Sequence, residues 1–258
     1  MQMFVLIKMS PDTVEELTVA ADGKSLDGET LRYKLGDSDE HALEQALLLK
    51  ERHGGTVTVV ALDAPETDDA LFTALAKGAH RVIKLCGDFT SLESPAAARL
   101  LADFLKSQNA SLPADALVLL RSQAVDDLAG EIGPFLAEAL AAPYIGVVTS
   151  VAPGGSGLVV TKELGRGLRG EFTLPLPAVL GIQSAEKPPR YVPIAKVRAA
   201  MKTGRIETRD VAPAAAAAPV AVERMYAPEA AGRATMLEGS DEQVSEQIVA
   251  LLAKRNLI

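Results

Sequence analysis

Short buried strands alternate with amphipathic helices through the first half of the chain, and this alternation restricts the fold more than any other feature of the sequence. Continuous β-branched runs such as TVTVVAL predict strands that are covered on both faces. Apolar residues at three- and four-residue spacing predict the helices between them. The predicted strands are Met3–Ile7, Thr56–Leu62, Arg81–Leu85 and Ala116–Leu120, and the predicted helices are Ser38–Arg52, Asp68–Lys77 and Ser94–Gln108. Repeated βα units predict an α/β fold with a doubly wound, mostly parallel sheet.

The carboxyl ends of the strands mark the edge at which such sheets bind ligands. The segments that leave three of the predicted strands begin at Lys8, Leu62 and Arg121. A further helix is expected after the segment that begins at Arg121. Asp37 or Ser38 is expected to cap the helix predicted at Ser38–Arg52. Ligand-binding residues are therefore expected in these three segments.

The most informative of these segments is Arg121–Pro134, RSQAVDDLAGEIGP, which is polar and rich in small residues. It leads into a predicted helix, Glu131–Leu140. Backbone N–H groups at the start of that helix can bind a phosphate. The alternative is that Asp126 and Asp127 form an ordinary solvated cap, and position alone does not separate the two interpretations.

The second half of the chain is predicted to be antiparallel. Gly-rich turns, not helices, join its strands Tyr144–Val151, Gly157–Glu163, Glu171–Leu174 and Ala178–Ile182. The segment GRGLRG (Gly165–Gly170) has the spacing of a dinucleotide-binding fingerprint, which requires a helix after it. Pro175 and Pro177 follow, so no helix can begin there. We interpret the segment as a hairpin turn.

Residues 1–190 are expected to form the α/β domain, and residues 191–258 an extended C-terminal arm. The arm contains an Ala/Pro-rich linker at 211–222, VAPAAAAAPVAV, and closes with an amphipathic helix, Glu242–Leu252. A low-complexity linker of this kind is typical of a tether. A tether with a helix at its end suggests an arm that reaches a partner.

Composition excludes several classes of function. A net charge of -8 argues against a binder of duplex nucleic acid, and an aromatic content of 4% argues against stacking on single strands. No apolar run has the length of a membrane span, and no secretory signal is apparent at the start, so a cytoplasmic protein is expected. The single Cys86 cannot form an internal disulfide.

No catalytic site is predicted. His41, His53 and His80 lack the spacing of metal ligands, and the serines have no evident base beside them. Neither a P-loop nor a nucleophile elbow is present in the sequence. The sequence therefore offers no convincing hydrolytic site.

Several stretches, taken in order, resemble the β subunit of electron transfer flavoprotein. The chain opens with a strand ending in Lys8 and a Pro-Asp turn, and GDSDEHALEQALLLKE (Gly36–Glu51) is similar to the family's second loop and first helix. ALAKGAHR (Ala74–Arg81) and the segment Gln123–Gly133 follow. Further matches are KELGRG, LPAVL, EKPPRY and the tail RMYAPEAAGRATMLEG (Arg224–Gly239). No single motif is specific, but the ordered set is.

The resemblance implies a Rossmann-like fold of the adenine-nucleotide-binding type and a subunit that shuttles electrons without catalysing a reaction. The α subunit would hold the redox FAD, and this chain would hold one structural AMP. The heterodimer would accept electrons from a flavin-dependent dehydrogenase and pass them to an acceptor such as a quinone oxidoreductase. Two alternatives remain: a bifurcating β subunit with its own FAD in place of AMP, and a stand-alone adenine-nucleotide-binding regulator.

The residues carried over from the family fall in the same three segments. The implied AMP contacts are Leu6, Gly36, Asp37, Ser38, Asp39, Leu62, Arg121, Ser122, Gln123, Ala124, Val125, Asp126, Asp127, Leu128, Ala129, Gly130, Glu131 and Ile132. Two of them depart from the family pattern, because Gly36 replaces an asparagine and Glu131 brings an acidic group near a phosphate. Thr13 stands where many members place an aromatic residue near the flavin.

The resemblance also implies contacts with partners. Glu163 matches a glutamate that pairs with an arginine of the α subunit. The loop before Pro-Arg-Tyr matches a segment that docks the dehydrogenase, and its residues here are Ala185, Glu186, Pro189, Arg190 and Tyr191. Glu186 is expected at the position of an apolar anchor, where a carboxylate would forfeit burial energy of roughly 1.5–3 kcal/mol. Either the pocket of the dehydrogenase is basic, or Ala185 or a neighbour supplies the anchor, and an atypical dehydrogenase is expected as the partner.

Overall fold

The structure is a computed structural model that describes residues 1–29, 31–89, 92–108, 112–155, 157–212, 222–228, 232 and 234–258. Its elements are β1 (Gln2–Ile7), β2 (Met9–Pro11), β3 (Tyr33–Leu35), α1 (Asp37–His53), β4 (Thr56–Leu62), α2 (Thr67–Lys77), β5 (Arg81–Cys86), α3 (Ser94–Ser107), β6 (Ala116–Arg121), α4 (Ile132–Leu140), β7 (Tyr144–Gly154), β8 (Gly157–Gly165), β9 (Leu168–Leu174), β10 (Ala178–Ile182), α5 (Ile194–Thr203), β11 (Glu207–Asp210) and α6 (Asp241–Lys254).

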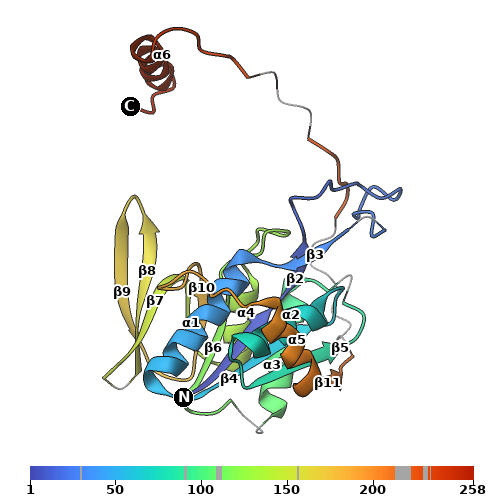
Figure 1. Ribbon diagram of the computed structural model, residues 1–258. Coiled ribbons are helices and arrows are strands. Elements are labelled where there is room, and N and C mark those ends of the chain that lie inside the picture. The colour runs from blue at the N-terminus through green and yellow to red at the C-terminus, as the bar shows by residue number, and fades with distance from the viewer. Residues whose placement is uncertain are drawn as a thin grey trace.

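The described part of the chain forms one large mixed sheet with the strand order β11-β5-β4-β1-β6-β10-β7-β8-β9 (Figure 1). The central strands β5, β4, β1, β6 and β10 are parallel to their neighbours, which confirms the predicted α/β fold. The chain moves outward from β1 in one direction through β4 and β5, and in the other through β6 and β10. The sheet therefore has its topological switch point between β1 and β6, where such folds bind ligands.

Two helical layers cover the parallel part of the sheet, and side chains alternate between them along each strand. In β1, Met3, Val5 and Ile7 belong to the core cluster under α1 and α2. Phe4 and Leu6 belong to the cluster under α3 and α4. This alternation explains why the central strands read as continuous apolar runs, because both of their faces are buried.

The antiparallel prediction is correct for three of the four strands in the second half and wrong for β10, which pairs parallel with both β6 and β7. Strands β7, β8 and β9 pair antiparallel to one another, and β7 joins the parallel sheet beside β10. The GRGLRG segment forms the β8–β9 turn, in which Gly165 and Gly167 adopt positive φ angles of 84° and 77°. Glycine adopts such angles without a steric penalty, so the glycine spacing serves a hairpin. Strand β9 begins at Leu168, three residues before its predicted start.

The sheet domain extends further along the chain than the predicted boundary at residue 190. Helix α5 packs against α2, and β11 pairs parallel with β5 through the register Glu207↔Ile83 to Asp210↔Cys86. Arg81 and Glu207 form a bidentate ion pair across this edge. The short, charged sequence ETRD of β11 has no local apolar pattern, so its strand conformation depends on the neighbouring strand.

Beyond Asp210 the chain leaves the sheet. Most of the predicted linker, at 213–221, lies outside the described residues. The Met225 N–H donates a hydrogen bond of 2.6 Å to the Gly23 carbonyl, so the arm touches the loop between β2 and β3. Helix α6 has a capping box at Ser240 and Gln243 and no buried residue, and Figure 1 shows it apart from the sheet. Among the described helices, none combines the length and apolar composition needed to cross a membrane.

Candidate functional site

A cleft of about 270 Å³ lies at the switch point, at the edge where β1 and β6 end. Its lining comes from the segment after β1, the start of α1, the loop after β6 and the residue after β10. The lining residues are Ser10, Thr13, Lys34, Gly36, Asp37, Ser38, Asp39, Gln123, Ala124, Val125, Leu128 and Gln183. Two of the three predicted ligand segments therefore meet around one cavity.

Other predicted contacts lie outside this lining. Leu6 is 3% exposed and, with Leu62, belongs to the apolar packing under α3 and α4. Eight further predicted contacts belong to the loop after β6 or adjoin it but do not line the cavity: Arg121, Ser122, Asp126, Asp127, Ala129, Gly130, Glu131 and Ile132.

Four lining residues were not predicted as contacts: Ser10, Thr13, Lys34 and Gln183. The strand-end rule could have found Ser10 and Gln183, because they follow β1 and β10 closely. Thr13 and Lys34 are brought in by the small β2–β3 sheet, which the sequence does not indicate.

Asp39 is the buried acid of the cleft. It stands in the first turn of α1 with no exposed surface. Its Oδ1 accepts a hydrogen bond of 3.2 Å from the Lys8 backbone N–H and faces the Arg121 guanidinium at 3.5 Å. Its Oδ2 has no hydrogen-bond partner, and neither has Nε of Arg121, which is 5% exposed. Burial raises the pKa of Asp39 to about 6, against the opposing effect of Arg121 and the Lys8 N–H.

The helix cap beside Asp39 differs from the prediction. Gly36, and neither Asp37 nor Ser38, occupies the N-cap position of α1, and no side chain caps the helix. A Cβ at Gly36 would lie 3.0 Å from Asp39 Oδ2. An asparagine there, as in the related family, would place a polar side chain beside this oxygen. Its absence leaves the acceptor without a partner next to the cleft.

The loop after β6 is held by its own polar contacts. The Ser122 hydroxyl donates a hydrogen bond to the Gly181 carbonyl and accepts one from the Val147 N–H, each at 2.7 Å. Gln123 Nε2 donates to the Leu128 carbonyl, and Gly130 turns the chain with a φ of 65°. The loop therefore keeps its shape through contacts that do not involve a ligand.

The cations around the cleft already have carboxylate partners. Lys8 Nζ lies 2.7 Å from Asp126 and 3.4 Å from Asp127. Lys34 Nζ lies 2.8 Å from Asp12, and Arg121 faces Asp39. Both aspartates therefore pair with Lys8 and neither caps α4, so the interpretation as a helix cap is wrong. Ligand binding by this loop stays a prediction.

The start of α4 offers backbone groups in place of side-chain cations. Glu131 is the N-cap of α4 and makes no side-chain cap hydrogen bond, and the helix begins at Ile132. Pro134, in its first turn, has no N–H to offer. A phosphate near this helix would therefore be bound by the few free N–H groups of residues 131–133.

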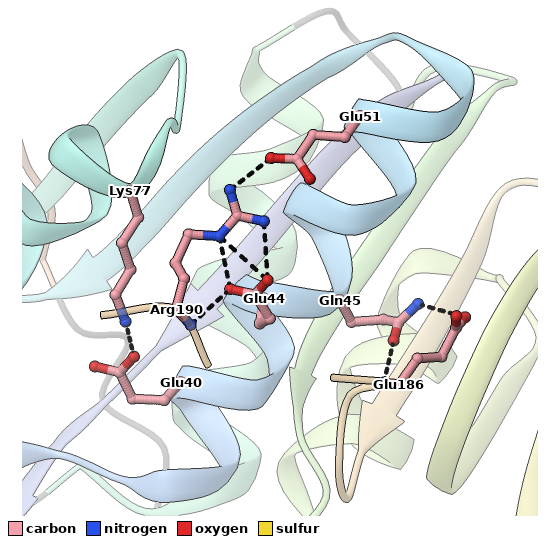
Figure 2. Close-up of polar contacts among 7 residues, drawn as sticks. All are labelled: Glu40, Glu44, Gln45, Glu51, Lys77, Glu186 and Arg190. Atoms are coloured by element: carbon pink, nitrogen blue, oxygen red, sulfur yellow. Dashed lines mark hydrogen bonds and ion pairs between the residues drawn. The ribbon is translucent and has the colours of Figure 1, made fainter. Parts of the chain in front are cut away.

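The predicted partner contacts are spread over two surfaces. Glu163 lies in the exposed part of β8. Ala185 and Glu186 lie against α1: the Ala185 N–H donates to His41 Nδ1, and the Glu186 N–H donates to Gln45 Oε1. Figure 2 shows Gln45 and Glu186 facing each other.

The position expected to present an apolar anchor, Glu186, instead carries a carboxylate that is turned along the chain's own surface toward α1. Arg52 donates to it at 2.6 Å, and Gln45 and Ser150 donate to it at 3.4 and 3.3 Å. Burial alone would raise the pKa of Glu186, but the hydrogen bonds from Arg52 and Gln45 outweigh it and lower this pKa. A carboxylate satisfied in this way is explained within the chain, so its presence is no evidence for an unusual dehydrogenase.

Comparisons with known proteins agree with the fold and the sequence resemblance. The sequence model of the electron transfer flavoprotein domain matches residues 26–215. Three proteins similar to this chain are electron transfer flavoprotein subunit beta of Methylophilus methylotrophus (29% identical, 98% of both chains), that of Syntrophomonas wolfei (32%, 84% of this chain and 81% of the relative) and Protein FixA of Azorhizobium caulinodans (26%, 99% and 95%). The chain therefore belongs to the electron transfer flavoprotein family, among its β subunits.

Proposed function

We propose that this chain forms a heterodimer with an electron transfer flavoprotein α subunit that carries FAD. The heterodimer takes electrons from a flavin-dependent dehydrogenase and passes them to a downstream acceptor, such as a quinone oxidoreductase. The similarity to β subunits along almost the whole chain is the observation that carries this proposal. In this role the chain is an electron carrier subunit that supplies geometry and docking surfaces.

The cleft and its surroundings fit an adenine nucleotide, and we propose AMP as the ligand. The unpartnered Oδ2 of Asp39, a residue that lines the cleft, can accept from a ribose hydroxyl or the adenine amino group. The N–H groups at the start of α4 would hold the phosphate, because the neighbouring cations are neutralised. AMP has no redox chemistry of its own, so its contribution is to brace the loops that meet here.

The surfaces available to partners lie apart from the cleft. The arm and α6 leave the sheet domain with no buried residue in α6, as expected of an element that packs on the α subunit. We assign Glu163 to the α-subunit interface on the family resemblance. For the dehydrogenase, the structure favours the segment after Arg190, since Tyr191 and Ile194 are 83% and 66% exposed.

The charge around this segment indicates the kind of surface that it meets. Helix α5 carries Lys196, Arg198 and Lys202 and no acidic residue. This basic stretch contrasts with the net charge of -8 of the whole chain. An apolar pocket with an acidic rim on the dehydrogenase would match exposed Tyr191 and Ile194 beside a basic helix.

Coexpression with the α subunit tests the proposal. We expect a purified 1:1 heterodimer with one flavin and one AMP, counted after denaturation by absorbance and chromatography. Two flavins without AMP would indicate the bifurcating type, and failure to bind any α subunit would leave the stand-alone regulator.

A second measurement tests the AMP site by itself. Asp39→Asn should lower the AMP content, because the amide's nitrogen cannot accept a hydrogen bond and the buried charge is lost. Asp69→Asn is the matched control, since it removes a carboxylate from the first turn of α2. Equal AMP content in both variants would show that Asp39 is not a contact.

A further inference from the structure

Glu44 is a buried carboxylate in the middle of α1, and Arg190 satisfies it almost completely. Glu44 is 3% exposed. Arg190 Nε donates to both carboxylate oxygens, at 3.1 and 2.9 Å, and a terminal nitrogen donates at 2.8 Å. The backbone N–H of Arg190 adds a fourth hydrogen bond of 3.0 Å. Figure 2 shows the guanidinium lying between Glu44 and Glu51, and Glu51 accepts from its other terminal nitrogen at 2.5 Å.

This contact fixes the backbone as well as the side chain of Arg190. A buried carboxylate is costly without a hydrogen-bonded partner, so Glu44 favours the one conformation of residue 190 that makes all four hydrogen bonds. Glu44 and Arg190 are 146 residues apart in the sequence. The pair therefore ties the chain after β10 to the outer face of α1.

The segment between β10 and Arg190 is also held to α1 by hydrogen bonds. Upstream, the N–H groups of Ala185 and Glu186 bind His41 and Gln45 of α1. Pro188 and Pro189 lie between these contacts and Arg190, and each proline has a fixed φ. Residues 185–190 thus form a stiff strap along α1, which we call the α1 strap.

The exposed apolar side chains begin where the α1 strap ends. Tyr191 directly follows the anchored Arg190, and Ile194 stands at the first position of α5. Pro193 again restricts the backbone between them. The position of Tyr191 is therefore set from one side by the Glu44–Arg190 pair and from the other by α5, which packs on α2.

We propose that Arg190 is a positioning residue for docking: with Glu44 and Glu51 it holds the α1 strap so that Tyr191 and Ile194 are presented in one fixed arrangement to the dehydrogenase. This inference rests on the proposed function and deepens it. Arg190 itself points toward α1. It acts by removing the entropy cost of ordering the segment when the complex forms.

Arg190→Gln in the α–β heterodimer tests the proposal by amide exchange. The exchange of the hydrogen-bonded amides of Ala185, Glu186 and residue 190 should rise, while the core strands stay protected. Unchanged exchange at these positions would show that Arg190 does not order the strap and would overturn the proposal.

Docking is measured with the dehydrogenase purified by its ability to reduce the wild-type heterodimer. Arg190→Gln should raise the Kd by roughly tenfold, which corresponds to the cost of ordering one or two side chains. Arg190→Lys keeps the charge but loses the bidentate fork, so its Kd should lie between that of the wild type and that of Arg190→Gln. A wild-type Kd in Arg190→Gln would overturn the proposal.

Two further variants separate positioning from stability. The double variant Glu44→Met with Arg190→Met replaces the pair by apolar groups. Its free energy of unfolding should return toward that of the wild type, while its Kd for the dehydrogenase stays raised. Lys106→Gln is the control, because it removes a hydrogen bond of 2.6 Å to the Ala139 carbonyl between α3 and α4, in the helical layer on the other face of the sheet, and its docking should equal that of the wild type. Restored docking in the double variant, or an equal loss in Lys106→Gln, would count against positioning. If no dehydrogenase reduces the wild type, the proposed function fails, while the exchange result still stands.

Discussion

Helix α1 carries two buried carboxylates that each face an arginine, and the two pairs differ in how completely they are satisfied. Glu44 accepts four hydrogen bonds from Arg190, and Glu51 shares the same guanidinium. Asp39 accepts one backbone hydrogen bond and faces Arg121 at 3.5 Å, with Oδ2 and the arginine Nε left over. The two sites lie on one helix, but the carboxylate of Glu44 is fully hydrogen-bonded and that of Asp39 is not.

The difference separates a site that is complete from one that has capacity left. A fully bonded ion pair holds two parts of the chain together and has nothing to offer a ligand. A buried acceptor without a partner is costly unless another group supplies a donor. This contrast supports a structural role for Glu44 with Arg190 and a ligand-binding role for Asp39.

The largest expected effect is on stability. Arg190→Met should lower the free energy of unfolding by about 3–5 kcal/mol, because it leaves the Glu44 carboxylate buried and uncompensated. Urea unfolding measures this loss. A loss below about 1 kcal/mol would mean that water or Glu44 protonation replaces Arg190 easily, and the contrast with Asp39 would disappear.

The second effect is a pH dependence of the free energy of unfolding that arises from Asp39. Its pKa is about 6 in the folded chain and 3.8 ordinarily, so the folded state keeps a proton that the unfolded state releases between these values. The stability from this group is full below pH 3.8 and is lost as the pH rises through 6, by about 3 kcal/mol.

Asp39→Asn cannot titrate and should lack this component. The free energy of unfolding of the wild type minus that of the variant should therefore fall by about 2.5 kcal/mol between pH 4 and pH 7.5. A difference that does not change with pH would show that Asp39 is satisfied and ionised throughout.

A smaller effect is expected at Glu186. Glu186→Leu removes the hydrogen bonds from Arg52, Gln45 and Ser150, which are partly exposed, and should cost about 1 kcal/mol or less. The affinity for the dehydrogenase should not change, because the carboxylate faces α1. Tighter binding of the leucine variant would instead show that this position docks the partner.

The smallest effect is expected at Gly36. Gly36→Asn supplies a helix cap and should stabilise the chain by a few tenths of a kcal/mol. Its amide also gives Asp39 Oδ2 a possible donor, so the pH-dependent component of stability should shrink. Thermal unfolding at pH 5 and pH 7.5 measures both. A destabilised variant would show that the contact at 3.0 Å leaves no room for a Cβ.

Local patterns were sufficient to predict most of the parallel sheet. Strands β4 and β10 have the predicted bounds, and β1, β5 and β6 differ from them by one residue. These strands are buried on both faces, and a buried strand shows itself through its own apolar composition. The hairpin at GRGLRG was predictable for a similar reason, since turn residues act within a few positions.

The cleft was predictable only in part. The strand-end rule and the family resemblance placed Asp39 and the segment at 121–132 near one edge. They could not show that Asp39 is fully buried or that Lys8 already pairs with Asp126, because both depend on how separate segments pack.

By itself, the sequence determined the α/β alternation, the order of the strands along the chain and the family to which the chain belongs. Only the tertiary structure decided that β11 adds an edge to the sheet, that Glu186 pairs with Arg52 of α1 and that Arg190 binds α1. Each of these depends on charged residues more than 100 positions apart. Periodicity reports which face of an element is apolar, but it carries no information about which distant charge will meet a buried carboxylate.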